Sequence, residues 1–153
     1  MSPLLATIDV EAASRLRVVI GRLSRRLRPT EAAVAAGLTP TKISVLLHVG
    51  RAGRIRLSEL SDSEGINPTM MSRVIADLAD AGLVERASDP GDRRAAFVEA
   101  TATGRKLAER IRSERTDALN EALEGLDERE RSEIEAALPA LERLAEELKG
   151  NRP

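Results

Sequence analysis

Two prolines, Pro40 and Pro68, each follow a residue whose side chain can cap a helix, Thr39 and Asn67 respectively. Threonine and asparagine favour the N-cap position, and proline suits the first helical turn, where its missing N–H costs no hydrogen bond. The chain is therefore predicted to start one helix at each proline. The stretch between the two starts must hold one full helix and the turn that leads into the next.

The helix that starts at Pro40 is predicted to end within residues 50–54, which hold two glycines. A short helix is predicted to follow from Ser58, with Leu60 facing inward, and Gly65 permits the turn that ends it. Together with the helix that starts at Pro68, this order indicates two helices joined by a glycine-containing turn, which is a helix-turn-helix.

The helix that starts at Pro68 carries apolar residues at spacings of three, one and three, which places them on one buried side. Gly82 fits the left-handed position after the end of this helix. The buried side is predicted to consist of Met71, Val74, Ile75 and Leu78. The opposite, outward side is predicted to consist of Thr69, Ser72, Arg73 and Ala76, while Met70 either faces outward or joins the core.

A turn-forming run, Asp-Pro-Gly-Asp at residues 89–92, separates two stretches that suit short β-strands, 83–88 and 95–100. Arg93 and Arg94 directly follow the turn, so a hairpin would project both cations away from the body. An isolated Arg-Arg pair is usually only a solvated surface, and its place after a turn is what favours a binding role. A helix-turn-helix followed by a hairpin is the pattern of a winged helix-turn-helix protein.

Both ends of the chain carry apolar residues at alternating spacings of three and four, typical of helices that pack on other helices. The first such helix is predicted over residues 9–28, followed by a link or a short, weak helix up to Gly37. Thr101 is predicted to cap a long helix that ends near Gly125, and Pro139 to kink or restart the last helix. A second copy of the chain is the simplest cover for the apolar stripes. The predicted dimer contacts include Leu16, Ile20 and Leu23 near one end and Leu138, Leu141 and Leu148 near the other.

The residue types that are missing exclude several kinds of chemistry. The chain has no cysteine, which excludes disulfides and thiolate catalysis, and its single histidine, His48, is too few for a histidine-built metal site. A packed or surface position explains His48 better than a catalytic one. Because a glycine-rich phosphate loop is also missing, the chain is predicted not to be an enzyme and to need no cofactor.

The length, hydropathy and charge of the chain further limit the class of protein to which it can belong. The 153 residues suit one domain with helical arms, and no apolar run approaches the roughly 20 residues of a membrane span. The N-terminus lacks the layout of a signal peptide, so a cytoplasmic protein is expected. Residues 32–104 carry eight basic and nine acidic side chains. Any contact with DNA must therefore depend on where a few cations stand.

From Leu38 to Leu107 the sequence resembles the MarR family of bacterial transcriptional regulators. The run Gly-Leu-Val-Glu-Arg at 82–86, followed by Asp-Pro-Gly-Asp-Arg-Arg at 89–94, is highly specific for this family. Further matches lie at residues 38–40, 57–60, 65–67, 78–81 and 101–105. Pattern and resemblance together predict a mainly α-helical fold with a small β-hairpin wing. The predicted division is an N-terminal dimerisation helix with its link at 1–36, a winged helix-turn-helix domain at 37–104 and C-terminal dimerisation helices at 105–153.

The helix that starts at Pro68 is the expected recognition helix, whose first residues reach base edges in the major groove of double-stranded DNA. Arg73 either reads guanine or holds a phosphate, and a solvated arginine is the alternative. Met70 contacts a thymine methyl or a sugar unless it lies in the core. The expected contact residues are Pro68, Thr69, Met70, Ser72 and Arg73.

For the wing, the resemblance implies that Arg94 enters the minor groove, Arg93 contacts a phosphate and Asp92 orients an arginine. Arg86 is expected to support the base of the wing. Ser58 either caps its helix, contacts a phosphate, or does both.

The chain departs from the family pattern in two places. Residues 61–64, Ser-Asp-Ser-Glu, replace the usual alanine and leucine before the turn glycine, and Ala100 replaces a leucine. The acids at positions 62 and 64 are expected to lie close to the path of the DNA.

The predicted function is a homodimeric, sequence-specific repressor on a pseudo-palindromic operator with half-sites about one helical turn apart. The resemblance also implies relief by a small aromatic or anionic ligand, bound between the DNA-binding lobe and the dimer arms. The alternative is a helical protein–protein interaction module without DNA binding. Such a module would use the same arms but would have no reason to carry Arg93 and Arg94 on a projecting turn.

Overall fold

The computed structural model describes residues 10–89 and 91–150, with the backbone alone at 93–95, 149 and 150. The fold is mainly helical with one small antiparallel sheet, as the sequence predicts. Within these ranges, no helix is both long enough and apolar enough to cross a bilayer. The elements in order are α1 (Val10–Leu27), α2 (Glu31–Ala35), α3 (Pro40–Ala52), β1 (Ile55–Arg56), α4 (Leu57–Glu64), α5 (Pro68–Asp80), β2 (Val84–Asp89), β3 (Asp92–Ala100), α6 (Ala102–Glu124) and α7 (Glu128–Gly150).

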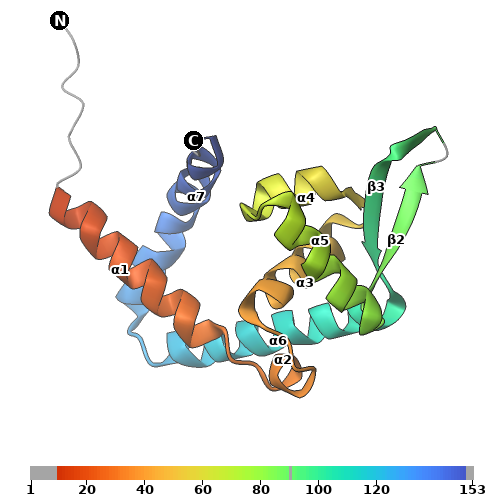
Figure 1. The fold of residues 1–153 in the computed structure, drawn as a ribbon. Coiled ribbons are helices and arrows are strands. Elements are labelled where there is room, and N and C mark those ends of the chain that lie inside the picture. Colours follow the sequence, from red (N-terminus) through yellow and green to blue (C-terminus); the bar gives the residue numbers. More distant parts are fainter. Residues whose placement is uncertain (1–9, 90, 151–153) are drawn as a thin grey trace, which may run out of the picture.

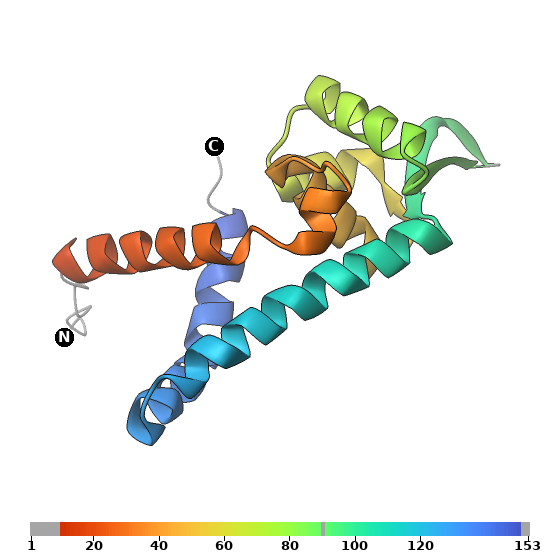
Figure 2. The same cartoon turned by 90° about the horizontal axis from the view of Figure 1, so that it is seen from below.

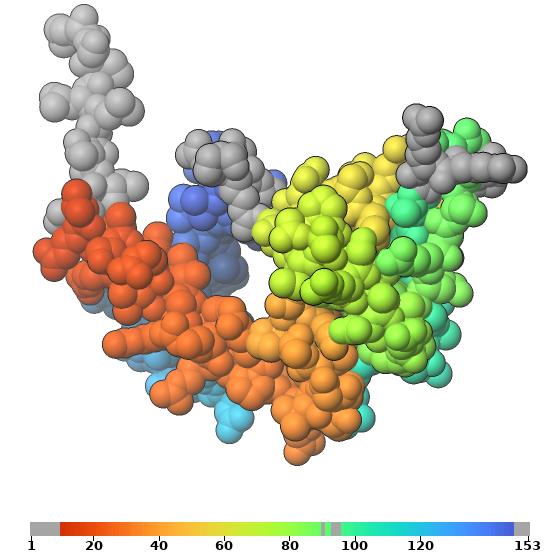
Figure 3. Space-filling view, in the orientation of Figure 1, coloured from red at the N-terminus to blue at the C-terminus, as the bar shows by residue number. Residues whose placement is uncertain are grey.

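The molecule has a compact lobe and two projecting helices. α3 and the sheet pack on α6, α4 and α5 pack on α3, α7 leaves from the far end of α6, and α1 reaches away from the lobe on the side of α2 (Figures 1 and 2). Open space separates α7 from the lobe (Figure 3). One buried apolar cluster holds the lobe together, and its fully buried members include Leu46, Leu60, Met71, Ile75, Leu78 and Val98.

Local signals fix both ends of α5. The Asn67 side chain accepts a hydrogen bond from the Met70 N–H at 2.8 Å, which satisfies one of the free donors of the first turn. At the other end, the Leu83 N–H donates to the Leu78 carbonyl, and Gly82 takes the left-handed conformation at φ +73°. The predicted start of this helix and the predicted place of Gly82 are confirmed.

The sheet has three strands in the order β1-β3-β2, one more than the predicted hairpin. β1 pairs with β3 through Ile55 opposite Val98 and Arg56 opposite Phe97. β3 is also longer than predicted, since it begins directly after the turn at Asp92. β1 joins the hairpin to the core, because Ile55 packs against the buried cluster opposite Val98, which is fully buried.

One predicted helix end is confirmed and two other predictions are wrong. α3 ends at Ala52, inside the predicted range 50–54. α4 starts at Leu57 with Arg56 at the N-cap, so Ser58 is its second residue and the prediction that Ser58 caps the helix is wrong. α7 is assigned as one helix through Pro139, so a restart at that proline is also wrong.

The junction between α6 and α7 is held by its own hydrogen bonds. The Asp127 carboxylate accepts from the Glu130 N–H, and the Glu130 carboxylate accepts from the Asp127 N–H, which forms a capping box for α7. Arg131 donates to the carbonyl of Leu126 at 3.0 Å and so satisfies an acceptor at the end of α6. These contacts fix the direction in which α7 leaves α6.

Candidate nucleic-acid interface

α5 separates its two sides as its periodicity predicts. Met71, Ile75 and Leu78 are fully buried, whereas Met70 is 50 % exposed and lies outside the core. Pro68, Thr69 and Arg73 are exposed and Ser72 is half-buried. The first turns of α5 therefore present the predicted contact residues to solvent, with the apolar side anchored below them.

Two contacts hold α5 to its neighbours. Arg86 of β2 donates to the Ser72 carbonyl at 3.2 Å, so the base of the hairpin is tied to the middle of α5. Lys42 of α3 pairs with Asp77 of α5 at 2.9 Å. The helix and the hairpin are thereby held in one arrangement, which a surface that must match DNA needs.

The helix-turn-helix has an unusual polar contact in place of an apolar one. The Glu64 carboxylate accepts a hydrogen bond from the Ser44 hydroxyl at 2.6 Å and lies 2.7 Å from Nδ1 of His48. Ser44 and His48 are both residues of α3. Ser61 is buried, where a small side chain lets the helices approach closely. Glu64 therefore turns back toward α3, whereas Asp62 is exposed, and the expectation that both acids lie close to the path of the DNA stays a prediction.

The wing is a hairpin whose turn is closed by a side chain. Asp89 accepts a hydrogen bond from the Gly91 N–H at 2.9 Å, and the register of the two strands shifts between Ser88 and Asp89. Asp92 is exposed and makes a contact of its own. Pro90 and the side chains of Arg93 and Arg94 lie outside the described part of the chain, so the roles of the two arginines stay predictions.

Ser58 and the arm residues are all on the surface. Ser58 is exposed in the first turn of α4, so its contact with a phosphate stays a prediction. The six leucines and isoleucines expected at the dimer contact are between 36 % and 61 % exposed in the single chain. The stripes that the sequence predicts are thus present, and the described residues leave them partly exposed.

Sequence reasoning missed two basic residues at β1, Arg56 in the strand and Arg54 directly before it. Arg54 and Arg56 flank Ile55 and lie over the ring of Phe97. The alternation Arg-Ile-Arg before Leu57 was a faint strand signal, but two residues are too short for a period-two pattern to stand out. His48 and Glu64 were likewise not paired, because nothing in the local sequence connects residues sixteen apart.

A capped outward helix behind a glycine turn, followed by a three-stranded sheet with a projecting hairpin, defines a winged helix-turn-helix protein. A family model described as the MarR family matches residues 38–96. An HTH-type transcriptional regulator of Mycobacterium tuberculosis is 33 % identical over 139 residues, which cover 91 % of this chain and 96 % of that protein. The chain belongs to the MarR family and is a DNA-binding transcriptional regulator, not an enzyme.

Solved structures share the fold. RV1404 from Mycobacterium tuberculosis is similar with a TM-score of 0.78 and 23 % identity, covering 95 % of this chain and 96 % of that one. FabT from Streptococcus pneumoniae, solved in complex with DNA, has a TM-score of 0.72 and 17 % identity, covering 89 % of this chain and 99 % of that one. The arms as well as the lobe therefore follow a known architecture.

Proposed function

We propose that the chain is a homodimeric repressor that binds a pseudo-palindromic operator. In this proposal residues 37–104 contact DNA, while residues 1–36 and 105–153 join two copies. The observation that carries it is the combination of an outward α5 beside a wing with two arms whose apolar stripes are exposed. A two-fold dimer places two copies of α5 in successive major-groove faces of one duplex.

Arg94→Ala is expected to lower operator affinity by about 1–3 kcal/mol, roughly 5- to 150-fold, because a cation is lost from the minor groove. Fluorescence anisotropy with an operator found by footprinting measures this. Arg112→Ala on α6 is the control, since it removes the same charge from a surface ion pair with Glu109. Equal affinities of wild type and Arg94→Ala would contradict the assigned role of the wing. In a reporter strain, removal of the protein should raise transcription, and a fall would contradict repression.

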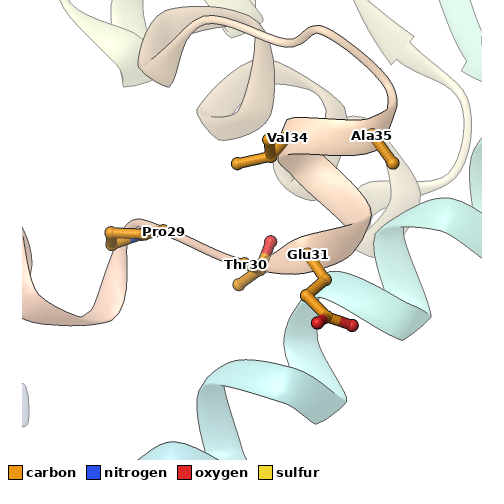
Figure 4. Close-up of a pocket in the computed structure, with 5 residues that line it drawn as sticks. All are labelled: Pro29, Thr30, Glu31, Val34 and Ala35. Carbon is orange, nitrogen blue, oxygen red and sulfur yellow. The ribbon is translucent and has the colours of Figure 1, made fainter.

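The junction of α1, α2 and α6 supports a small anionic ligand as the signal. Arg115 of α6 is half-buried, and its Nε has no hydrogen-bond partner among the described residues. Burial lowers the pKa of Arg115 below its usual value, and the positive charge of Arg28 lowers it further. An anion between these two cations would relieve both costs. A largely apolar groove of about 420 Å³, lined by Pro29, Thr30, Glu31, Val34 and Ala35, directly follows Arg28 in the sequence (Figure 4), and the Ala32 N–H within this segment donates to Glu114, the residue before Arg115.

We expect aromatic monocarboxylates to raise the melting temperature and to release operator DNA, while the matching uncharged amides do neither. A ligand at 100 times its Kd stabilises the folded state by about 2.7 kcal/mol. In the Arg115→Gln variant the shift should disappear. A shift of the same size in wild type and variant would place the ligand elsewhere.

A further inference from the structure

The outer edge of the wing sheet carries two arginines on one aromatic ring. The guanidinium carbon of Arg54 lies 4.9 Å from the centre of the Phe97 ring, and that of Arg56 lies 5.3 Å from it. Two cations this close to one another repel, and the electron-rich faces of an aromatic ring offset part of that repulsion. The single aromatic residue of the chain thus holds two positive charges in fixed positions.

Strand geometry shows which way these side chains point. Val98 is fully buried and pairs with Ile55, so both face the core. Phe97 and its partner Arg56 are the neighbouring pair, and they must point to the opposite side of the sheet. Arg54 and Arg56 are accordingly exposed on the outer face.

A hydrogen bond brings Arg54 next to the tip of the wing. Its guanidinium donates to the Ser88 carbonyl at 3.2 Å, and Ser88 immediately precedes Asp89, which closes the turn. At about 3.3 Å per strand residue, the charge of Arg54 stands roughly 10 Å or less from the turn. A hairpin that enters the minor groove is flanked by phosphates at this distance, since duplex DNA carries one charge for about every 1.7 Å of its axis.

The positive charges of Arg54 and Arg56 are available to a binding partner. Neither arginine forms an ion pair with a described residue. The acids on the same face, Glu85 and Glu99, are paired across the strands nearer the base of the hairpin. The outer face thus carries the two cations between the paired glutamates at the base and the acids Asp89 and Asp92 at the turn, so a polyanion that contacts this face would do so at the arginines. A planar guanidinium is well suited to phosphate oxygens.

We propose that Arg54 and Arg56, held by Phe97, form a phosphate clamp for the operator backbone beside the wing. The clamp rests on the DNA-binding function and adds affinity without reading sequence, because phosphate contacts position a protein on DNA and base contacts specify the site. Arg54→Gln and Arg56→Gln should therefore weaken operator and unrelated duplex by the same factor.

The test is a salt titration of DNA binding by wild type, Arg54→Gln, Arg56→Gln and the double variant. Each lost phosphate contact should reduce the slope of log K against log salt by about 0.9, so a single variant, which removes one contact from each copy of the dimer, should lose about 1.8 and the double variant about 3.6. Arg112→Gln, which removes a charge from α6, should keep the wild-type slope. If the wild type binds DNA and the arginine variants keep its salt slope, the clamp alone is overturned. A wild type that binds no duplex overturns both the clamp and the DNA-binding function.

The variant Phe97→Leu distinguishes the contribution of the aromatic ring from that of the two arginine charges. It keeps both arginines and the apolar character of the site but removes the aromatic faces. We expect a smaller loss of affinity than in the double arginine variant, with an unchanged melting temperature because Phe97 is only half-buried. Affinity and salt slope equal to wild type would show that the ring does not hold the clamp.

Discussion

Gly104→Ala is expected to lower the free energy of unfolding by about 3 kcal/mol or more, the upper end of overpacking effects. Gly104 is buried in the first turn of α6, where an added Cβ would lie 1.8 Å from the Leu83 carbonyl oxygen and 2.8 Å from its carbon. Both atoms belong to the backbone, so no side chain can rotate away. The Leu83 carbonyl also accepts from the Thr101 N–H at 3.1 Å, which anchors it to the same helix start.

Urea denaturation followed by circular dichroism measures this loss, at one fixed protein concentration because unfolding of a dimer depends on it. Gly125→Ala is the control. Gly125 has a right-handed φ of −74°, and its added Cβ would meet the nearest oxygen at 3.4 Å. We expect it to change stability by less than about 1 kcal/mol. A Gly104→Ala variant as stable as this control would show that α6 does not pack so closely on the turn after α5.

The lobe could be predicted from sequence because its signals are local. The ends of α5 are set by Asn67, Pro68 and Gly82, whose effects reach only a few residues along the chain. The spacing of the apolar residues in α5 predicts which of its sides is buried. The turn at residues 89–92 likewise marks the hairpin. Such features need no knowledge of distant partners, so the order of elements and the outward residues of α5 follow directly.

The features that escaped prediction depend on distant contacts. β1 is two residues long and exists because it pairs with β3, more than forty residues later. The direction of Glu64 is set by His48 and Ser44 on another helix, which the residues next to Glu64 in the sequence do not reveal. At Pro139 the local rule predicted a kink or a restart, and the restart is wrong because one missing hydrogen bond does not end a helix that continues on both sides.

The double variant Leu138→Glu with Leu141→Glu is expected to be monomeric. Every residue of α7 from Glu128 to Leu148 is exposed in the single chain, although the helix carries an apolar stripe along its length. A dimer would bury two copies of each leucine, and full burial of one leucine contributes about 1.5–3 kcal/mol. Because Leu138 and Leu141 are 47 % and 40 % exposed in the single chain, replacing the four leucines of a dimer by glutamates removes roughly 3–5 kcal/mol of burial and places four like charges in the contact.

Loss of the dimer should lower operator affinity by about 10²- to 10⁴-fold, because two joined copies bind two half-sites far more tightly than one. Light scattering after gel filtration gives the mass, and anisotropy on full and half operators gives the affinity. The variant should bind a half operator with the same affinity as the wild type, since the core of the lobe contains neither leucine. Arg129→Ala, on the side of α7 opposite the stripe, should stay dimeric. A leucine variant that keeps wild-type mass and affinity would refute the role of α7 as a dimer arm.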